Sequence, residues 1–477
     1  MKLIPVCKEI GVDLETPVSV FLKLQRIGAK FLLESVEKGE KLGRYSFIGL
    51  NPSSILEIKE DEFLLDGKTV SFQKNDFLEK LREIIFPFKL TTDQELPSFA
   101  GGWVGYLGYD VIRFFEILPS KLPSDLDIPM GILCLIKDIL VFDHLKHKVK
   151  VIILTSSKEE NQKAVKKIER IVQAINTPMD LKKRTEEKSS VMKKPQSNFK
   201  KKEFEKIVER AKEYILDGDV FQVVLSQRFS GETSAMPFKI YRKLRMINPS
   251  PYMFFLDFKD FKLIGSSPEA LVKLNKDVAY LHPIAGTRSR GRTLQEDNQL
   301  AEELFQSEKE IAEHVMLVDL ARNDLGKVCL PHSIKVIEKM NLEKYSHVMH
   351  LVSEVRGLLD RKFDAIDLFK ATFPAGTVTG APKIRAMEII EELEKTKRGP
   401  YSGAVGYFGL DGNIDMCIAI RMIIYQKGKY YLQAGAGIVA DSIPSSEYRE
   451  TLNKMEGLYQ AIKMSEENED DFANRQL

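Results

Sequence analysis

Two pairs of glutamates stand three residues apart in this chain, a spacing that could bring carboxylates together. Glu310 and Glu313 belong to the segment EKEIAEHVMLVDLARNDLGK, and Glu447 and Glu450 belong to SSEYRETLNKMEGLYQAIK. Both segments have the apolar periodicity of a helix, so each pair projects from one helical face with Cβ atoms roughly 5–6 Å apart. Such pairs are either solvated helix surface or oxygen ligands for a hard cation such as Mg²⁺. The spacing alone leaves both interpretations open.

Other reactive residue types restrict the chemistry further. The glycine-rich segment AGTVTGAPK lacks the spacing of a phosphate-binding loop, because only three residues separate Gly376 from Gly380. The four cysteines stand in extended apolar segments, which fit neither a metal site nor the tight elbow of a glutamine-hydrolysing nucleophile. His347 and His350 lie in YSHVMHLVSEVRG, whose alternation predicts a strand. Histidine proton transfer therefore remains open, whereas hydrolysis of glutamine by this chain is not expected.

Composition indicates a globular protein that acts on small molecules. The chain has 477 residues, of which 43% are hydrophobic and 29% charged, and its 71 basic and 69 acidic side chains give a net charge of +2. That balance does not indicate a nucleic-acid or anionic-membrane partner. Neither a signal peptide nor an apolar run of about 18 residues is evident. The scattered cysteines also fit a reducing compartment, so we expect a cytoplasmic location.

The elements that must position these residues follow one another without a regular strand–helix–strand rhythm. This order predicts an α+β fold with antiparallel sheets. Apolar spacing predicts a helix over residues 202–218, and the next segment, 220–231, has the character of a strand. The sequence divides into an N-terminal region (1–175), a charged linker (176–200), a C-terminal region (201–462) and an acidic tail (463–477).

Nine motifs occur in the order seen in the chorismate-utilising enzymes. They are LLESVEKGEKLGRYSFIG, NPSPYMFFL, IGSSPEALV, HPIAGTRSRG, EKEIAEHVMLVDLARNDLGKV, YSHVMHLVSEVRG, FPAGTVTGAPKIRAMEII, GPYSGAVGYFG and SSEYRETLNKMEGL. The chain resembles the anthranilate synthase component I branch of that family most closely, from about residue 15 to residue 460. The resemblance implies a sandwich of antiparallel sheets with outer helices. It also implies a reaction in which ammonia attacks ring carbon 2 of Mg²⁺-bound chorismate, the ring hydroxyl departs, and elimination of pyruvate leaves anthranilate, the first step of tryptophan biosynthesis.

The resemblance also assigns roles to residues at matching motif positions. Glu313 and Glu450 correspond to direct Mg²⁺ ligands, and Glu310 and Glu447 to ligands acting through water. Glu269 would be the general acid for the departing hydroxyl, His350 would assist pyruvate elimination, and Thr377 would complete the catalytic set. The positions implied to bind chorismate are Gly286, Thr287, Tyr401, Arg421, Gly435, Ala436, Gly437 and Lys454.

Two positions distinguish branches of the family. Relatives that make aminodeoxychorismate often have a nucleophilic lysine where this chain has Ala285, and a methyl group cannot attack the ring. Isochorismate-forming relatives have a water-activating lysine where this chain has Gln222, and an amide is no base. Both residues favour attack by free ammonia. Some aminodeoxychorismate synthases also lack the lysine, so that alternative remains open.

The resemblance further implies an inhibitory tryptophan site and a partner. Its contacts would be Glu34, Ser35, Pro251, Tyr252 and Met253; without the family, these residues would be read as ordinary packing. Ammonia would come from a separate glutamine amidotransferase subunit, component II, in a hetero-oligomer. A third hypothesis is a catalytically silent subunit that senses tryptophan, although that would require a broken set of metal and catalytic residues.

Overall fold

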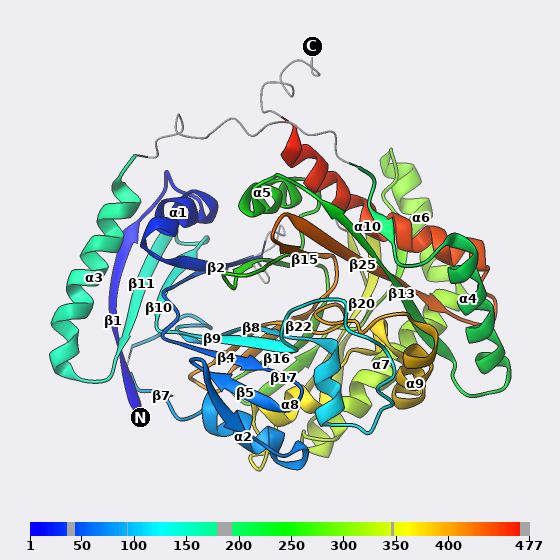
Figure 1. Ribbon diagram of the computed structural model, residues 1–477, viewed down its shortest axis with the longest axis horizontal. Helices are drawn as coiled ribbons and strands as arrows, with labels where there is room; N and C mark the ends of the chain where they lie inside the picture. Colours follow the sequence, from blue (N-terminus) through cyan, green and yellow to red (C-terminus); the bar gives the residue numbers. More distant parts are fainter. Residues whose placement is uncertain (36–42, 93, 179–192, 345–347, 468–477) are drawn as a thin grey trace.

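Two large, mostly antiparallel sheets form the computed structural model, which describes residues 1–35, 43–92, 94–178, 193–344 and 348–467 (Figure 1). Within these residues the first sheet has 13 strands, in the order β12 (Gln196–Ser197), β13 (Gln222–Glu232), β25 (Lys429–Ile438), β24 (Met422–Gln426), β15 (Lys262–Ser267), β14 (Tyr252–Asp257), β2 (Ala29–Glu34), β3 (Tyr45–Leu50), β10 (Asp138–Asp143), β11 (Lys148–Thr155), β1 (Lys2–Gly11) and β7 (Lys89–Leu90), with β21 (Gly380–Ala381) beside β13.

The second sheet has 12 strands among the described residues. Their order is β18 (Ile284–Ser289), β20 (Val348–Leu358), β17 (Val278–Leu281), β16 (Ala270–Asn275), β23 (Ile414–Ile418), β22 (Ala404–Gly409), β8 (Gly102–Leu107), β9 (Gly131–Ile136), β4 (Ser54–Ile58), β5 (Glu62–Leu65) and β6 (Lys68–Ser71), with β19 (Lys335–Lys344) beside β20. Neighbouring strands are antiparallel except for the short β1–β7 pair. The predicted α+β class with antiparallel sheets is confirmed.

Strands of the first sheet alternate between two hydrophobic clusters, as the two-residue period of a strand requires. In β14, Phe254 and Leu256 face the largest cluster, which also contains strands of the second sheet, whereas Met253 and Phe255 face the outer helices. Those outer helices are α1 (Pro17–Leu24), α3 (Lys158–Asn176), α5 (Pro237–Ile247) and α10 (Pro444–Glu466) (Figure 1). The first sheet is therefore buried on both sides.

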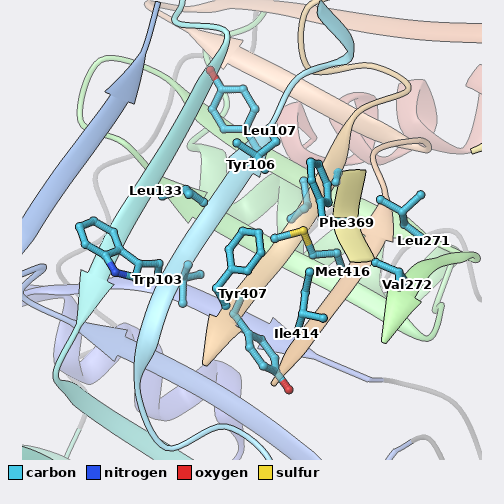
Figure 2. Packing of buried hydrophobic residues seen from close by; sticks show 14 of the residues in the cluster. Trp103, Tyr106, Leu107, Leu133, Leu271, Val272, Phe369, Tyr407, Ile414 and Met416 are labelled. Carbon is cyan, nitrogen blue, oxygen red and sulfur yellow. The ribbon is translucent and has the colours of Figure 1, made fainter. Parts of the chain in front are cut away.

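Helices also cover the second sheet and the β13 edge. Trp103 of β8 donates from Nε1 to the carbonyl of Ile85 at 3.2 Å, which ties the sheet to α2 (Phe77–Ile85). Phe369 of α8 (Ala365–Thr372) packs among residues of β8, β16 and β23 (Figure 2). The remaining helices are α6 (Leu294–Gln306), α7 (Glu308–Gly326), α4 (Lys201–Leu216) and α9 (Lys383–Leu393). The predicted helix at 202–218 and strand at 220–231 correspond to α4 and β13. No helix in the described part of the chain is long and apolar enough to cross a membrane.

The two sequence regions on either side of the linker share both sheets. β2 of the N-terminal region pairs with β14 of the C-terminal region in one sheet, and β8 pairs with β22 in the other. Of the predicted linker, 179–192 lies outside the described residues. At the other end, α10 continues past residue 463, where the sequence places the start of the tail, and Glu466 accepts from the Ser234 amide at 2.7 Å. Residues 468–477 of that tail are outside the described residues.

The chain crosses from one sheet to the other at two neighbouring places. Glu269 lies between β15 of the first sheet and β16 of the second, and Arg421 lies between β23 and β24. The Ser266 amide donates to the Arg421 carbonyl at 3.0 Å, and the Ile418 amide donates to the Glu269 carbonyl at 3.0 Å. These backbone bonds hold the two crossovers side by side, so residues far apart in sequence reach one place.

Candidate active site

A cavity of about 490 Å³ opens beside the two crossovers and is bounded by β13, β18, β25, α7 and α10. It collects most of the side chains predicted to form the site. Those lining it are Gln222, Glu269, Ala285, Gly286, Glu310, Glu313, His350, Thr377, Tyr401, Arg421, Gly435, Gly437, Glu447, Glu450 and Lys454. Eleven of these fifteen residues come from seven of the nine motifs, and Gln222, Arg421, Gly435 and Gly437 lie outside the motifs. The fold rather than the sequence makes them neighbours.

Two predicted substrate positions are not among these residues, and one polar residue that lines the cavity was not predicted. Ala436 turns its methyl into the hydrophobic cluster on the other face of β25, together with residues of α4 and α9, and does not line the cavity. Thr287 belongs to β18, but its side chain lies outside the described part of the structure. Gln433 does line the cavity and was missed by the sequence reasoning. Its signal was available, because Gln433 shares a strand face with Gly435 and Gly437.

Glu269 is a buried carboxyl with the properties of an acid. Burial raises its pKa to about 8, against the opposing effects of a hydrogen bond from Thr377 and the charge of Lys454. Thr377 Oγ1 donates to Glu269 Oε1 at 2.9 Å. The carboxyl is therefore mostly protonated at neutral pH and can donate into the cavity.

His350 is a neutral imidazole with a defined tautomer. Burial lowers the pKa of His350 below its usual value. Its Nδ1 lies 3.0 Å from the carbonyl oxygen of Gly286, and because a carbonyl can only accept, Nδ1 carries the proton. In the neutral ring, Nε2 is then the basic atom. His350 can accept a proton there.

Hydrogen-bond donors also line the cavity. Burial raises the pKa of Tyr401 to about 12, so its phenol stays protonated. Arg421 donates from Nη1 to the carbonyl of Lys454 at 2.9 Å, and Lys454 Nζ donates to the carbonyl of Gly435 at 3.0 Å. A phenol, a guanidinium and an ammonium in one cavity suit a substrate that carries carboxylates.

The four predicted metal ligands face the cavity from two helices. Glu310 and Glu313 come from α7, and Glu447 and Glu450 come from α10. Arg288 Nη1 lies 3.1 Å from Glu310 Oε1, and Lys454 Nζ lies 2.6 Å from Glu450 Oε1. Across the described residues, no three acidic, histidine or cysteine side chains are grouped as one metal-binding cluster. The donor chemistry thus fits a divalent cation, whereas Glu310 and Glu450 are paired with basic side chains in this conformation.

The two branch-distinguishing residues also line the cavity. Ala285 is 8% exposed and belongs to β18. Gln222 donates from Nε2 to Glu313 Oε1 at 3.1 Å. The Gln222 amide is therefore hydrogen-bonded to a predicted metal ligand, Glu313, and offers no basic nitrogen to the substrate.

A second cavity of about 360 Å³ gathers all five residues predicted to bind an effector. Glu34, Ser35, Pro251, Tyr252 and Met253 line it at the β2–β14 junction between the two sequence regions. Glu34 is buried and accepts from Tyr241 and Arg245. Among the described residues, Ser35 Oγ is a buried atom with no hydrogen-bond partner. A cavity with a buried carboxylate and an unsatisfied hydroxyl is suited to a small polar ligand.

Comparison with known proteins decides the family. A family model described as chorismate binding enzyme matches residues 28–460. The chain belongs to this chorismate-binding family. Relatives named anthranilate synthase component 1 include one from Aquifex aeolicus (strain VF5), 48% identical over 98% of this chain and 96% of the relative, and one from Acetivibrio thermocellus, 46% identical over 97% and 95%.

Solved structures of the chorismate-binding family share the fold. Anthranilate synthase component I from Streptococcus pneumoniae TIGR4 has a TM-score of 0.80 at 37% identity, covering 94% of this chain and 98% of that one. The menaquinone-specific isochorismate synthase from Escherichia coli has a TM-score of 0.70 at 20% identity, covering 96% and 94%. At that identity the second likeness concerns the fold alone. Membership of the chorismate-binding family makes a divalent metal consistent with the four carboxylates of the first cavity.

Proposed function

We propose that this protein converts chorismate and ammonia to anthranilate and pyruvate, the first step of tryptophan biosynthesis. The observation that carries the proposal is the identity of 42–48% to relatives named anthranilate synthase component 1, which extends over nearly the whole chain. The lining of the first cavity supports it, since an acid, a base and carboxylate-binding donors face one space. A cytoplasmic location goes with this reaction, because chorismate and ammonia are water-soluble metabolites.

Binding would use the donors of the cavity. Tyr401 and Arg421 would hold the enolpyruvyl carboxylate, and the fork of the guanidinium suits a bidentate contact. Gly286, Gly435 and Gly437 would let the ring approach the backbone, because a side chain at any of them would enter the cavity or strike a lining group. We place Lys454 beside the substrate for its charge. Thr287 and Ala436 remain proposed substrate contacts, Ala436 through its backbone atoms.

The proton transfers follow from the two buried titratable groups. Glu269, kept protonated by burial and oriented by Thr377, would protonate the departing ring hydroxyl while ammonia forms the bond to ring carbon 2. His350, through Nε2, would take the ring proton as pyruvate leaves and the ring becomes aromatic. The acid and the base therefore serve successive steps.

Mg²⁺ is the cation we propose for the carboxylates of α7 and α10. Glu313 and Glu450 would bind it directly and Glu310 and Glu447 through water, and the ion would supply positive charge for the ring carboxylate of chorismate. The donor set fits such an ion because all four side chains are oxygen ligands on one cavity.

Ammonia is proposed to come from a partner. The relatives are named component 1, which implies a second component in those enzymes. We infer a glutamine amidotransferase subunit in a hetero-oligomer with this chain. Ala285 leaves the approach to the ring free of a competing amine.

L-Tryptophan is the proposed ligand of the second cavity and would act as a feedback inhibitor. Its ammonium group would meet the buried carboxylate of Glu34, and its polar atoms could satisfy Ser35 Oγ. Pro251, Tyr252 and Met253 would surround the indole. The apolar lining and the buried charge together favour an amino acid over a purely apolar ligand.

The test is to incubate the purified chain with chorismate, Mg²⁺ and ammonium at alkaline pH and to identify the product by fluorescence and chromatography. We expect anthranilate, which should disappear when a chelator or tryptophan is added. Aminodeoxychorismate as the product would show that Ala285 does not decide the branch. No product from an intact, folded chain would favour the silent tryptophan-sensing subunit instead.

A further inference from the structure

A third and smaller cavity borders the Glu269 carboxyl. Its volume is about 50 Å³, and it shares Glu269, Leu317 and Thr377 with the substrate cavity. A space of that size has room for at least one ordered water, provided that polar partners are present. Glu269 therefore borders two cavities, the substrate cavity and this smaller one, which we call the rear cavity.

His282, Asp324 and Thr372 supply the polar side chains of the rear cavity, besides the residues that it shares with the substrate cavity. His282 Nε2 lies 3.1 Å from Glu354 Oε2, and the side chains of the two residues are 28% and 14% exposed. His282 thus touches the rear cavity as well as solvent. Its motif, HPIAGTRSRG, holds substrate-site residues, yet the proposed mechanism gives His282 no part.

Glu354 is suited to support a charged imidazole. The hydrogen bond to His282, followed by contact with Arg356, lowers the pKa of Glu354 to about 2. Glu354 is therefore an anion at any working pH, and it can only accept the hydrogen bond that it shares with His282 Nε2. A histidine that is hydrogen-bonded to a carboxylate is a common arrangement for proton transfer.

The proposed reaction creates a need for such a carrier. Glu269 gives its proton to the ring hydroxyl, the carbon–oxygen bond breaks with its electron pair on oxygen, and water departs. The attacking ammonia loses one proton to solvent when the carbon–nitrogen bond forms. Glu269 is left as a carboxylate that must regain a proton before the next turnover, and substrate or product fills the cavity in front of it.

We propose that the rear cavity holds water that returns a proton to Glu269 from His282, which exchanges protons with solvent beside Glu354. This inference rests on the proposed function, since it requires Glu269 to act as an acid. His282 does not touch the substrate, so it is a positioning and proton-supplying residue rather than a catalytic one. Thr377, which donates to Glu269 Oε1, lines both cavities as Glu269 does.

Other charged groups face this route and affect the proton balance. Asp324 lines the rear cavity but is paired with Lys383 at 3.0 Å and with Lys327 at 2.8 Å. Lys454 and Arg421 face the substrate side of Glu269, together with His350. Near His282, the cations Arg356 and Lys273 both interact electrostatically with Glu354. His282 is the one titratable group lining the rear cavity, within the described residues, that also contacts a carboxylate open to solvent.

The experiment compares His282→Gln and His282→Ala with the unmodified chain, using chorismate and ammonium and measuring kcat for anthranilate at saturating substrate. We expect kcat to fall about tenfold in both variants, less than for loss of the acid itself. Added imidazole should restore kcat of His282→Ala in proportion to its concentration, because imidazole in its protonated form can donate a proton from the space that the removed side chain leaves. Ala321→Leu, which fills the rear cavity, should lower kcat without being rescued.

His332→Ala is the matched control, since His332 is exposed and lies outside both cavities. It should keep full kcat with or without imidazole. Unchanged kcat in His282→Gln, or a lowered kcat that imidazole does not raise in His282→Ala, would overturn the route while leaving anthranilate formation by the unmodified chain intact. No anthranilate from the unmodified chain would overturn the proposed function, and the route with it.

Discussion

At the scale of single residues, Glu269 is the group whose environment most constrains the chemistry. A carboxyl with a pKa of about 8 is kept protonated by burial, and the protonated form is the one that the proposed reaction needs. Activity at a fixed concentration of free ammonia should therefore hold up to about pH 8 and decline above it. A pH–kcat profile measured at constant free ammonia checks this, and a decline centred near pH 4.5 would contradict it.

Glu269→Gln should separate catalysis from stability. We expect kcat to fall by about 10²–10⁴-fold, the usual contribution of a general acid. Because the pKa of Glu269 is raised above its unfolded value, the folded chain holds an extra proton between about pH 4.5 and 8, and its stability falls as the pH rises through that window. The amide removes this loss. Thermal unfolding should show the variant gaining on the unmodified chain from pH 5 to pH 8.5, and no such gain would mean that the carboxyl is not buried as described.

Ala285 offers a second test at the same scale. Ala285→Lys places an amine on the lining of the substrate cavity, where it can compete with ammonia for the ring. We expect anthranilate formation to fall more than about tenfold and a chorismate-derived adduct to appear in the intact mass. Ala285→Met, which adds length without an amine, is the matched control and should form no adduct. An adduct with Met, or none with Lys, would contradict the assignment.

At the scale of elements, sequence periodicity was enough to place the carboxylates but not to bring them together. The spacing of apolar residues gave α7 and α10 and the pairing of each glutamate with its neighbour on one face. The two crossovers at Glu269 and Arg421 could not be read from the sequence, because they depend on which strand joins which sheet. The position of Ala436 was different, because strand alternation alone places it on the face opposite to Gly435 and Gly437. Motif resemblance supplied what periodicity lacked.

The face of β25 that lines the substrate cavity requires small residues at Gly435 and Gly437. This requirement can be tested at Gly437. An added Cβ at Gly437 would lie 2.6 Å from Gln222 Nε2, the movable end of a side chain. We therefore expect Gly437→Ala to fold normally, to displace the Gln222 amide from Glu313, and to raise the KM for chorismate by about tenfold, equivalent to about 1.4 kcal/mol. Gly457→Ala in α10, where nothing lies within 4 Å, should leave KM unchanged and slightly stabilise the helix. Equal KM values in the two variants would show that the strand face does not contact substrate.

At the scale of the whole molecule, one short stretch of backbone connects the cavity proposed to bind tryptophan with Glu269 of the substrate cavity. Cys417 lines the second cavity, and the next residue, Ile418, donates its amide to the Glu269 carbonyl at 3.0 Å and accepts from Ser267 Oγ at 2.7 Å. Tyr252 lines the same cavity and is paired in register with Ser267. A ligand that shifts β14 or β23 would thus shift the backbone that carries the acid. Because both sheets contain strands from both sequence regions, backbone hydrogen bonds join the two regions in each sheet.

This connection predicts that inhibition by tryptophan is a true coupling between two sites. If tryptophan weakens chorismate binding by some factor, chorismate must weaken tryptophan binding by the same factor. Titration calorimetry of tryptophan with and without saturating chorismate, set beside the shift in chorismate affinity at saturating tryptophan, checks this equality. Glu34→Gln removes the buried charge that we expect to meet the ammonium group, so tryptophan affinity should fall about tenfold or more. Tryptophan that competes at the first cavity would instead retain its affinity in this variant, and chorismate would exclude it completely rather than by a finite factor.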